Sequence, residues 1–306
     1  MKIKFWGVRG SIPCPGPDTI KYGGNTPCIE LRFKEIERQI IIDAGSGIRG
    51  LGNDMMVTDL PKGPIQTELF LTHTHWDHIM GFPFFTPIYL KDTKLKVYGP
   101  ASFENDTLKD IIGNQMSYRH FPIRQAELAS KIEYIELKEG PVKLKDDKIS
   151  ITTKWLNHPV LCLGYRFEYQ DKVVCTLYDS EPFQNIFSTR PEDPSYDETM
   201  ALEGKKTAQI QNKLLENFFK DADLVIRDAQ YTEEEYQASK KGWGHTSMEY
   251  AIESTKKAGV KRLALFHHEP TYSDKKFDEL TEKLCKPHTS ENMEIFFAKE
   301  GMEIIL

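Results

Sequence analysis

Apolar and polar residues alternate with the two-residue period of a β-strand along much of this chain. The first such run, Lys2–Val8, places Ile3 and Phe5 on one face and Lys2 and Lys4 on the other. Most later runs are rich in β-branched or aromatic residues and are bounded by Gly, Pro, Asn or Asp. The predicted strands are Lys2–Val8, Cys28–Phe33, Gln39–Ile42, Thr67–Leu71, Lys94–Tyr98, Ile149–Trp155, Leu163–Tyr169, Val173–Tyr178, Leu224–Ile226, Arg262–Phe266 and Met293–Ala298.

Helical periodicity, with apolar residues three and four positions apart, interrupts these strands. It predicts helices at Leu108–Asn114, Lys205–Phe219, Ser247–Lys257 and Phe277–Cys285. Strands and helices in this mixed order are typical of a layered α/β protein whose sheets are covered by helices. The segment Phe187–Glu203 is rich in Pro, Asp, Glu and Ser, and we expect a surface insertion near 187–203 in a single domain spanning 1–306.

Composition and charge narrow the classes of function. The chain has 306 residues, 39% hydrophobic and 28% charged, which is ordinary for a globular protein. It shows neither an apolar run of bilayer length nor a secretory signal, so the expected location is the cytoplasm. The net charge of −6, without a dense basic block, argues against a large nucleic-acid partner and allows a small anionic substrate. The five dispersed cysteines indicate free thiols rather than disulfides: Cys14, Cys28, Cys162, Cys175 and Cys285.

Candidate chemistry is concentrated in the segment Leu71-Thr72-His73-Thr74-His75-Trp76-Asp77-His78. In an extended strand end, His73 and His75 point to the same side, and Asp77 and His78 follow where the chain turns. Three imidazoles and a carboxylate in six residues are a ligand set suited to zinc and acceptable to manganese or iron. The segment therefore predicts a metal site.

A His-x-His-x-Asp-His motif after a strand resembles the metallo-β-lactamase superfamily. The resemblance implies a four-layer αβ/βα sandwich, in which helices flank two mixed sheets. It also implies a binuclear centre of two divalent ions, with Zn²⁺ preferred and Mn²⁺ or Fe²⁺ as alternatives. Three later residues resemble the remaining ligands of the family: His158 before Pro159, Asp179 after the strand Val173–Tyr178, and His267 after the strand Arg262–Phe266.

By the same resemblance, one metal would be held by His73, His75 and His158, and the other by Asp77, His78 and His267. Asp179 would bridge the two ions together with a water or hydroxide. His268 is the neighbour that could be confused with His267, but in an extended chain it points the opposite way.

Two further segments resemble the ribonuclease Z-like and cyclic-nucleotide phosphodiesterase branch of the superfamily. Asp228 and His245 match the acidic residue and the histidine that this branch pairs beside its metals. Thr246 and Glu249 predict a capping box that fixes His245 just before a helix. An Asp228–His245 hydrogen bond would favour the imidazolium, which is a proton donor for a leaving alkoxide. A purely structural His–Asp contact is the alternative.

The leading hypothesis is hydrolysis of a phosphodiester, with a small cyclic nucleotide as the best single substrate. A metal-bridging hydroxide would attack, Asp77 would help to orient it, and His245, held by Asp228, would protonate the leaving oxygen. The alternatives are a tRNA 3′-end endonuclease of the ribonuclease Z kind, a hydrolase of non-phosphate esters or lactones, and a metal-bound sensor without catalysis.

Two departures from ribonuclease Z argue against tRNA as the substrate. That family reaches tRNA with a basic, Gly/Pro-rich arm, whereas the insertion expected here is acidic and would repel a phosphate backbone. Arg227 also replaces the histidine that usually precedes the acidic residue of the pair. RNA therefore stays a secondary partner, and homodimers are common among such relatives.

Two other features remain open from the sequence. Arg9 either touches substrate or forms a structural salt bridge. The aromatic segment 115–122 either forms a lid, with rings that stack on a base, or packs as an ordinary loop.

Overall fold

Two seven-stranded sheets form the centre of the computed structural model, which describes residues 1–102, 106–144 and 148–306. The first sheet has the order β14-β1-β2-β3-β4-β5-β6 and is antiparallel up to β3 and parallel beyond it. Its strands are β1 (Lys2–Gly7), β2 (Cys28–Phe33), β3 (Arg38–Ile42), β4 (Gln66–Phe70), β5 (Lys94–Pro100), β6 (Lys131–Leu137) and β14 (Glu303–Ile305).

The second sheet has the order β13-β12-β11-β10-β9-β8-β7 and the same mixed pattern. The pairs from β10 to β13 are parallel, and those from β7 to β10 are antiparallel. Its strands are β7 (Gly140–Pro141), β8 (Ile149–Trp155), β9 (Leu163–Tyr169), β10 (Lys172–Leu177), β11 (Leu224–Asp228), β12 (Arg262–Phe266) and β13 (Glu294–Phe297).

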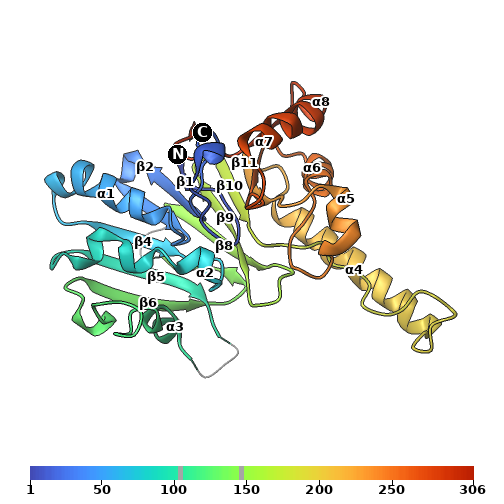
Figure 1. Cartoon of the computed structure of the whole chain (residues 1–306), viewed down its shortest axis with the longest axis horizontal. Helices are drawn as coiled ribbons and strands as arrows, with labels where there is room; N and C mark the ends of the chain where they lie inside the picture. The colour runs from blue at the N-terminus through green and yellow to red at the C-terminus, as the bar shows by residue number, and fades with distance from the viewer. Residues whose placement is uncertain (103–105, 145–147) are drawn as a thin grey trace.

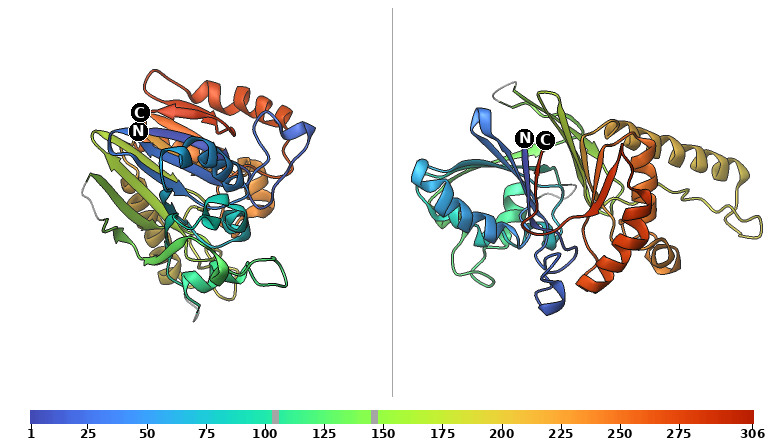
Figure 2. Two further views of the ribbon diagram at one scale, coloured as in Figure 1. Left: turned by 90° about the vertical axis from the view of Figure 1, so that its left-hand side faces the viewer. Right: turned by 90° about the horizontal axis from the view of Figure 1, so that it is seen from above.

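Helices cover the outer face of each sheet (Figures 1 and 2). On the first sheet lie α1 (Ile48–Thr58), α2 (Trp76–Ile79) and α3 (Leu108–Asn114). On the second lie α4 (Glu198–Phe218), α5 (Glu233–Glu235), α6 (Met248–Lys257), α7 (Asp274–Leu280) and α8 (Lys286–His288). None of the helices in the described ranges is long and apolar enough to cross a bilayer.

Three hydrophobic cores hold these layers together. One lies between the sheets and contains Phe5, Phe70 and Tyr165. The others lie between each sheet and its helices, around Leu51 on the first side and Phe277 on the second. Burial on both sides of both sheets confirms the predicted four-layer αβ/βα sandwich.

The structure differs from the predicted elements at a few places. Helix α1 was not predicted, because its sequence contains two glycines, which lower helix propensity. The edge strands β6 and β14 were also missed. Helix α4 begins at Glu198, because the Asp197 side chain accepts a hydrogen bond from the Met200 backbone N–H. The last part of the expected loop 187–203 is therefore helical, and α4 projects from the body of the molecule (Figure 1).

Arg9 has a structural place. It is fully buried; its Nε donates to the Gly23 carbonyl, and its Nη1 donates to the Glu269 and Tyr272 carbonyls at 2.9 and 2.8 Å. The guanidinium also lies 5.1 Å from the Phe277 ring centroid. It thus joins the N-terminal loop to the segment after β12, and among the described residues it forms none of the side-chain salt bridges that were one of the two alternatives.

We expect Arg9→Met to lower the free energy of unfolding by about 3 kcal/mol or more, because three buried carbonyls lose their donor. Urea unfolding of chelator-treated wild type and variant measures this loss apart from any effect of metal. Lys2→Met, on the partly exposed edge, is the control and should change little. Normal stability with lost catalysis would instead assign Arg9 to the substrate.

Candidate metal centre

The seven predicted ligands converge where strands of both sheets end. His73 and His75 follow β4, Asp179 follows β10 and His267 follows β12, at the carboxyl ends of these parallel strands. Ligands of α/β proteins commonly collect at this edge. The side chains form two groups that share Asp179, one with His73, His75 and His158 and the other with Asp77, His78 and His267.

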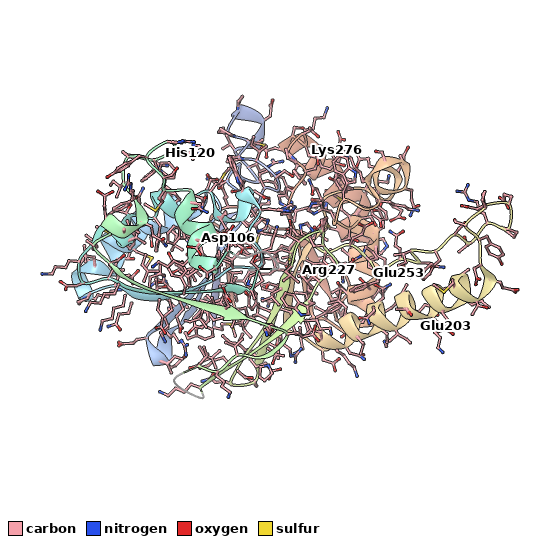
Figure 3. All side chains as sticks on the ribbon, turned by 90° about the horizontal axis from the view of Figure 1, so that it is seen from below. Asp106, His120, Glu203, Arg227, Glu253 and Lys276 are labelled. Carbon is pink, nitrogen blue, oxygen red and sulfur yellow. The ribbon has the colours of Figure 1, made fainter. Side chains whose placement is uncertain are left out.

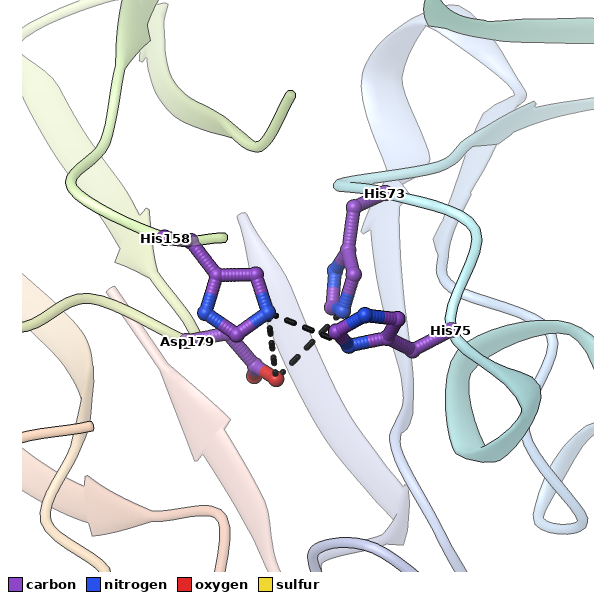
Figure 4. A group of neighbouring side chains, drawn as sticks. All are labelled: His73, His75, His158 and Asp179. Carbon is purple, nitrogen blue, oxygen red and sulfur yellow. Dashed lines mark hydrogen bonds and ion pairs between the residues drawn. The ribbon is translucent and has the colours of Figure 1, made fainter. Parts of the chain in front are cut away.

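The first group combines residues from both halves of the sandwich (Figure 4). His73 Nε2 and His158 Nε2 lie 3.4 and 3.8 Å from Asp179 Oδ2. His75 Nδ1 lies 3.1 Å from His158 Nε2. The Thr72 hydroxyl, 3.1 Å from His73 Nδ1, occupies the other ring nitrogen and leaves Nε2 to face the group.

Five of the distances between ligand atoms of the second group are nearly equal. His78 Nε2 lies 3.3 Å from Asp77 Oδ2, 3.2 Å from Asp179 Oδ1 and 3.3 Å from His267 Nε2. His267 Nε2 lies 3.1 Å from Asp77 Oδ2 and 3.3 Å from Asp179 Oδ1. Four ligands at about 2.0 Å from a tetrahedral zinc ion are about 3.3 Å apart. The spacing therefore fits one such ion.

Asp179 uses one carboxylate oxygen for each group, Oδ2 for the first and Oδ1 for the second. It and His267 have φ angles of 43° and 59°, in the left-handed region that is unfavourable for residues other than glycine. Strain of this kind persists only where surrounding contacts impose it, and it is common at functional sites.

Burial and charge test whether the cluster fits metal ions. Asp77 and Asp179 are 6% and 1% exposed, and two buried carboxylates this close need cationic partners. His73 Nε2 and Asp179 Oδ1 have no hydrogen-bond partner among the described residues, although both are buried. These unpaired atoms and the mixed imidazole and carboxylate donors fit a pair of divalent ions.

The protonation of the histidines agrees with this fit. Burial lowers the pKa of His73 well below its ordinary value and that of His158 to about 4, so both are neutral and able to bind metal. Burial also lowers the pKa of His78, but Asp179, Asp77 and Asp43 outweigh it and raise that pKa. The surrounding carboxylates thus stabilise positive charge at the position of His78.

Asp43, which the sequence analysis did not single out as a site residue, orients His78. Its Oδ2 lies 2.8 Å from His78 Nδ1, while its Oδ1 accepts from the Thr72 backbone N–H at 2.7 Å. A carboxylate on the second nitrogen of a metal-binding histidine fixes the ring and its tautomer. One sequence signal was an acidic residue directly after the buried strand β3.

A second carboxylate, Glu181, holds the loop beside His158. It accepts hydrogen bonds from the Gly242 and Gly244 backbone N–H groups and from the Tyr236 hydroxyl. The Gly244 carbonyl in turn accepts from His158 Nδ1 at 3.0 Å. Gly244 has φ +85°, and a Cβ there would collide with the His158 ring, so glycine suits this position.

The predicted Asp228–His245 pair is present beside the second group. His245 Nδ1 lies 2.6 Å from Asp228 Oδ2, and the His245 ring stacks on His267 with centroids 4.8 Å apart. Burial lowers the pKa of His245, but the ion pair with Asp228 outweighs it and raises the pKa to about 9. An imidazolium at neutral pH is a suitable proton donor.

The predicted capping box at Thr246 and Glu249 is wrong. The N-cap of α6 is Ser247, whose side chain accepts from the Tyr250 N–H, and Glu249 accepts from the Glu233 N–H instead. His245 still lies just before the helix, as predicted.

Two residues that neighbour site residues in the sequence, His268 and Arg227, lie outside the cluster. His268 points away as predicted, and its Nε2 donates to the Ala298 carbonyl at 2.8 Å. Arg227, labelled in Figure 3, is buried against Phe219 and Tyr250 and donates to the Ser254 hydroxyl. It is in neither group of ligand atoms.

The N-terminal loop also reaches the cluster, which the sequence analysis missed. The Ser11 backbone N–H donates to Asp77 Oδ2 at 2.7 Å. Gly10 lies so close to the His267 ring that a Cβ would collide with it. No side-chain motif marks a backbone donor, so pattern alone did not reveal this contact.

Two rings of the aromatic segment 115–122 make side-chain contacts, although Tyr118 is 55% exposed. Tyr118 donates to Glu127 and lies under the Arg124 guanidinium at 3.9 Å. Phe121 packs edge-on against Phe84. These contacts favour the packing alternative over a base-stacking lid.

No protein-family model matches the chain. Among curated proteins it is similar to ribonuclease Z of Lactococcus lactis subsp. lactis, with 25% identity over 89% of this chain and 90% of the relative. It is equally similar to ribonuclease Z of Pyrococcus abyssi, with 25% identity over 93% of this chain and 92% of the relative.

Solved structures share the fold at lower identity. The metallo-β-lactamase fold protein YhfI of Bacillus subtilis superposes with a TM-score of 0.63 at 16% identity, covering 99% of this chain and 98% of that one. The human short-form tRNase Z gives 0.60 at 17% identity, with 100% and 99% covered. Yeast PDE1 gives 0.62 at 13% identity, also with 100% and 99% covered. The chain therefore has the metallo-β-lactamase fold, and its resemblance to the ribonuclease Z-like hydrolases of that superfamily is confirmed.

Proposed function

We propose that this protein is a metal-dependent phosphodiesterase that hydrolyses a small cyclic nucleotide. The observation that carries the proposal is one buried carboxylate, Asp179, between two groups of ligand atoms, with the Asp228–His245 pair against one of them. Similarity to ribonuclease Z supports a phosphodiester as the bond cleaved.

Each residue has a distinct task in this proposal. One divalent ion would be held by His73, His75 and His158, and the other by Asp77, His78 and His267. Asp179 would bind both ions, and the set of donor atoms favours zinc. When bound, the ions would lower the pKa of a water and polarise the phosphoryl oxygens. The Ser11 N–H donates to Asp77 Oδ2 and so orients this carboxylate, which would in turn help to orient the attacking water. His245, kept charged by Asp228, would give its Nε2 proton to the leaving oxygen.

A tRNA endonuclease is the second candidate, favoured by similarity to ribonuclease Z over about nine tenths of the chain. The net charge of −6 and the acidic segment before α4 oppose it, because tRNA binding depends on neutralising many phosphates. A panel assay of metal-loaded protein separates the candidates. It should contain 3′,5′- and 2′,3′-cyclic nucleotides, a precursor tRNA, a lactone and a carboxylic ester.

We expect turnover of cyclic nucleotides and none of the precursor tRNA. Cleavage of the tRNA without turnover of cyclic nucleotides would favour the endonuclease. Turnover of the lactone or ester alone would reject phosphodiester chemistry, and failure on all substrates would leave a metal-bound sensor.

Metal content tests the ligand assignment with two adjacent histidines. We expect purified protein to hold about two ions per chain and His267→Ala about one, because a tetrahedral site loses one of its four ligands. His268→Gln is the matched control, since His268 points away from the cluster and should leave both ions bound. Elemental analysis after dialysis measures this. Equal metal in both variants would reject His267 as a ligand.

His245→Ala should reduce turnover about 10²- to 10⁴-fold, which is the usual contribution of a positioned proton donor. Because His245 is not among the proposed ligands, metal content should not change. His288→Ala, on the exposed α8, serves as the control for a histidine elsewhere. Steady-state rates with a cyclic nucleotide provide the measurement, and unchanged turnover would remove His245 from the mechanism.

A further inference from the structure

Exposed apolar side chains surround the polar metal cluster. Ile12 is 56% exposed beside Ser11, Trp76 is 77% exposed between His75 and Asp77, and Val160 and Trp243 are 36% and 55% exposed near His158 and His245. Each lies within two residues of a member of the site or of its direct contact Ser11. Single exposed apolar residues are normal, but three on loops and one at the start of α2, all next to residues of one centre, indicate contact with a partly apolar substrate.

Trp243 differs from the other three because its loop is rigidly held. The backbone N–H groups on either side of it, Gly242 and Gly244, both donate to the buried Glu181 carboxylate. The indole is thus presented on a fixed backbone although its side chain is exposed. A flat surface fixed before the substrate arrives costs little entropy on binding.

A chain of ring contacts connects Trp243 to the proposed proton donor. Lys240 Nζ lies 3.9 Å from the Trp243 ring centroid and 5.2 Å from that of Tyr231. Tyr231 in turn packs edge-on against His245, with centroids 6.2 Å apart. Trp243 is therefore linked through Lys240 and Tyr231 to the residue proposed to protonate the leaving group.

Lys240 supplies positive charge at the same place. No ion pair with a carboxylate is formed by Lys240 within the described ranges, and its ammonium covers one face of the indole. Trp243 is 55% exposed and has no other ring against it among the described residues, so a second planar group can stack on it. Trp76, in contrast, has neither a cation nor another ring against it in that part of the chain, so it is a poorer candidate for an ordered platform.

We propose that Trp243 and Lys240 form a nucleobase subsite, in which the indole stacks on the base of the substrate and the ammonium pairs with its phosphate. This rests on the proposed phosphodiesterase function and specifies its substrate class as a nucleotide, with purines preferred because they stack over a larger area. Base–aromatic stacking is tolerant of sequence and contributes substantially to binding.

The test compares one substrate that has a base with one that lacks it. Trp243→Ala should raise KM for 3′,5′-cyclic AMP roughly 5- to 100-fold, the range expected for loss of one stacking contact. Its effect on kcat/KM for propane-1,3-diyl cyclic phosphate should be several-fold smaller, since that six-membered phosphodiester has no base to stack and loses only the ring that supports Lys240. Trp243→Phe should restore most of the binding of cyclic AMP. Lys240→Met should weaken both substrates, because each carries the phosphate.

Three outcomes would overturn the subsite. Equal losses on both substrates in Trp243→Ala would mean that the loop only supports His245. No loss on cyclic AMP would mean that the base does not touch Trp243, and a loss in Trp76→Ala alone would put the base on the opposite side.

Failure of the proposed function is distinguishable from failure of the subsite. If the wild type hydrolyses no phosphodiester, calorimetric titration with 5′-AMP still measures base binding. Weaker binding by Trp243→Ala than by wild type would then support the subsite, and equal binding would reject it.

Discussion

The buried carboxylate of Asp179 is the contact on which the whole site depends, because its two oxygens lie among histidines from both halves of the sandwich. His73, from the first half, faces Oδ2, and His267, from the second, faces Oδ1. A buried anion of this kind is stable only with compensating charge. The Asp179 carboxylate therefore brings the ligands together and also requires nearby positive charge, which metal ions would supply.

The surrounding protein secures these ligands from behind. Asp43 fixes His78, the Gly244 carbonyl fixes His158, and the Ser11 N–H fixes Asp77. These supports come from three separate loops, and two residues of the cluster have left-handed backbone angles. Contacts of this kind fix the orientation of the ligand rings and carboxylates and so support the metal centre from outside.

Sequence patterns predicted the residues of this site that lie close together in the chain or that match a motif of a known family. The two-residue spacing of His73 and His75 follows from strand geometry. The expectation that His268 points away from His267 was confirmed, although the backbone at His267 is left-handed and not extended as assumed. Resemblance to a family located His158, Asp179 and His267, which spacing alone could not relate to one another. The α-helix α1 was missed because its glycines conceal a helix that tertiary packing of Leu51 and Met55 stabilises.

Other features depend on contacts that no local pattern contains. Asp43 and Glu181 were not recognised as supports because an acidic residue after a strand is usually an ordinary turn residue. The N-cap of α6 was predicted at Thr246 rather than at Ser247, because the sequence pattern did not show which contacts Glu249 makes. Either hydroxyl could begin the helix, and the choice is made by Glu249, whose carboxylate is engaged by the Glu233 N–H.

Glu181 links the metal centre to the surface that would meet the substrate. It lies two residues after Asp179 and binds both glycines that flank Trp243, while the same loop continues to His245. A displacement of this loop would therefore move the proton donor and the exposed indole together. The loop is also coupled to the metal ligands, because the Gly244 carbonyl accepts from His158 and a side chain at Gly244 would collide with that ring. Changes at Trp243 itself are less restricted, because its side chain is exposed, so this position can vary while the glycines on either side are kept.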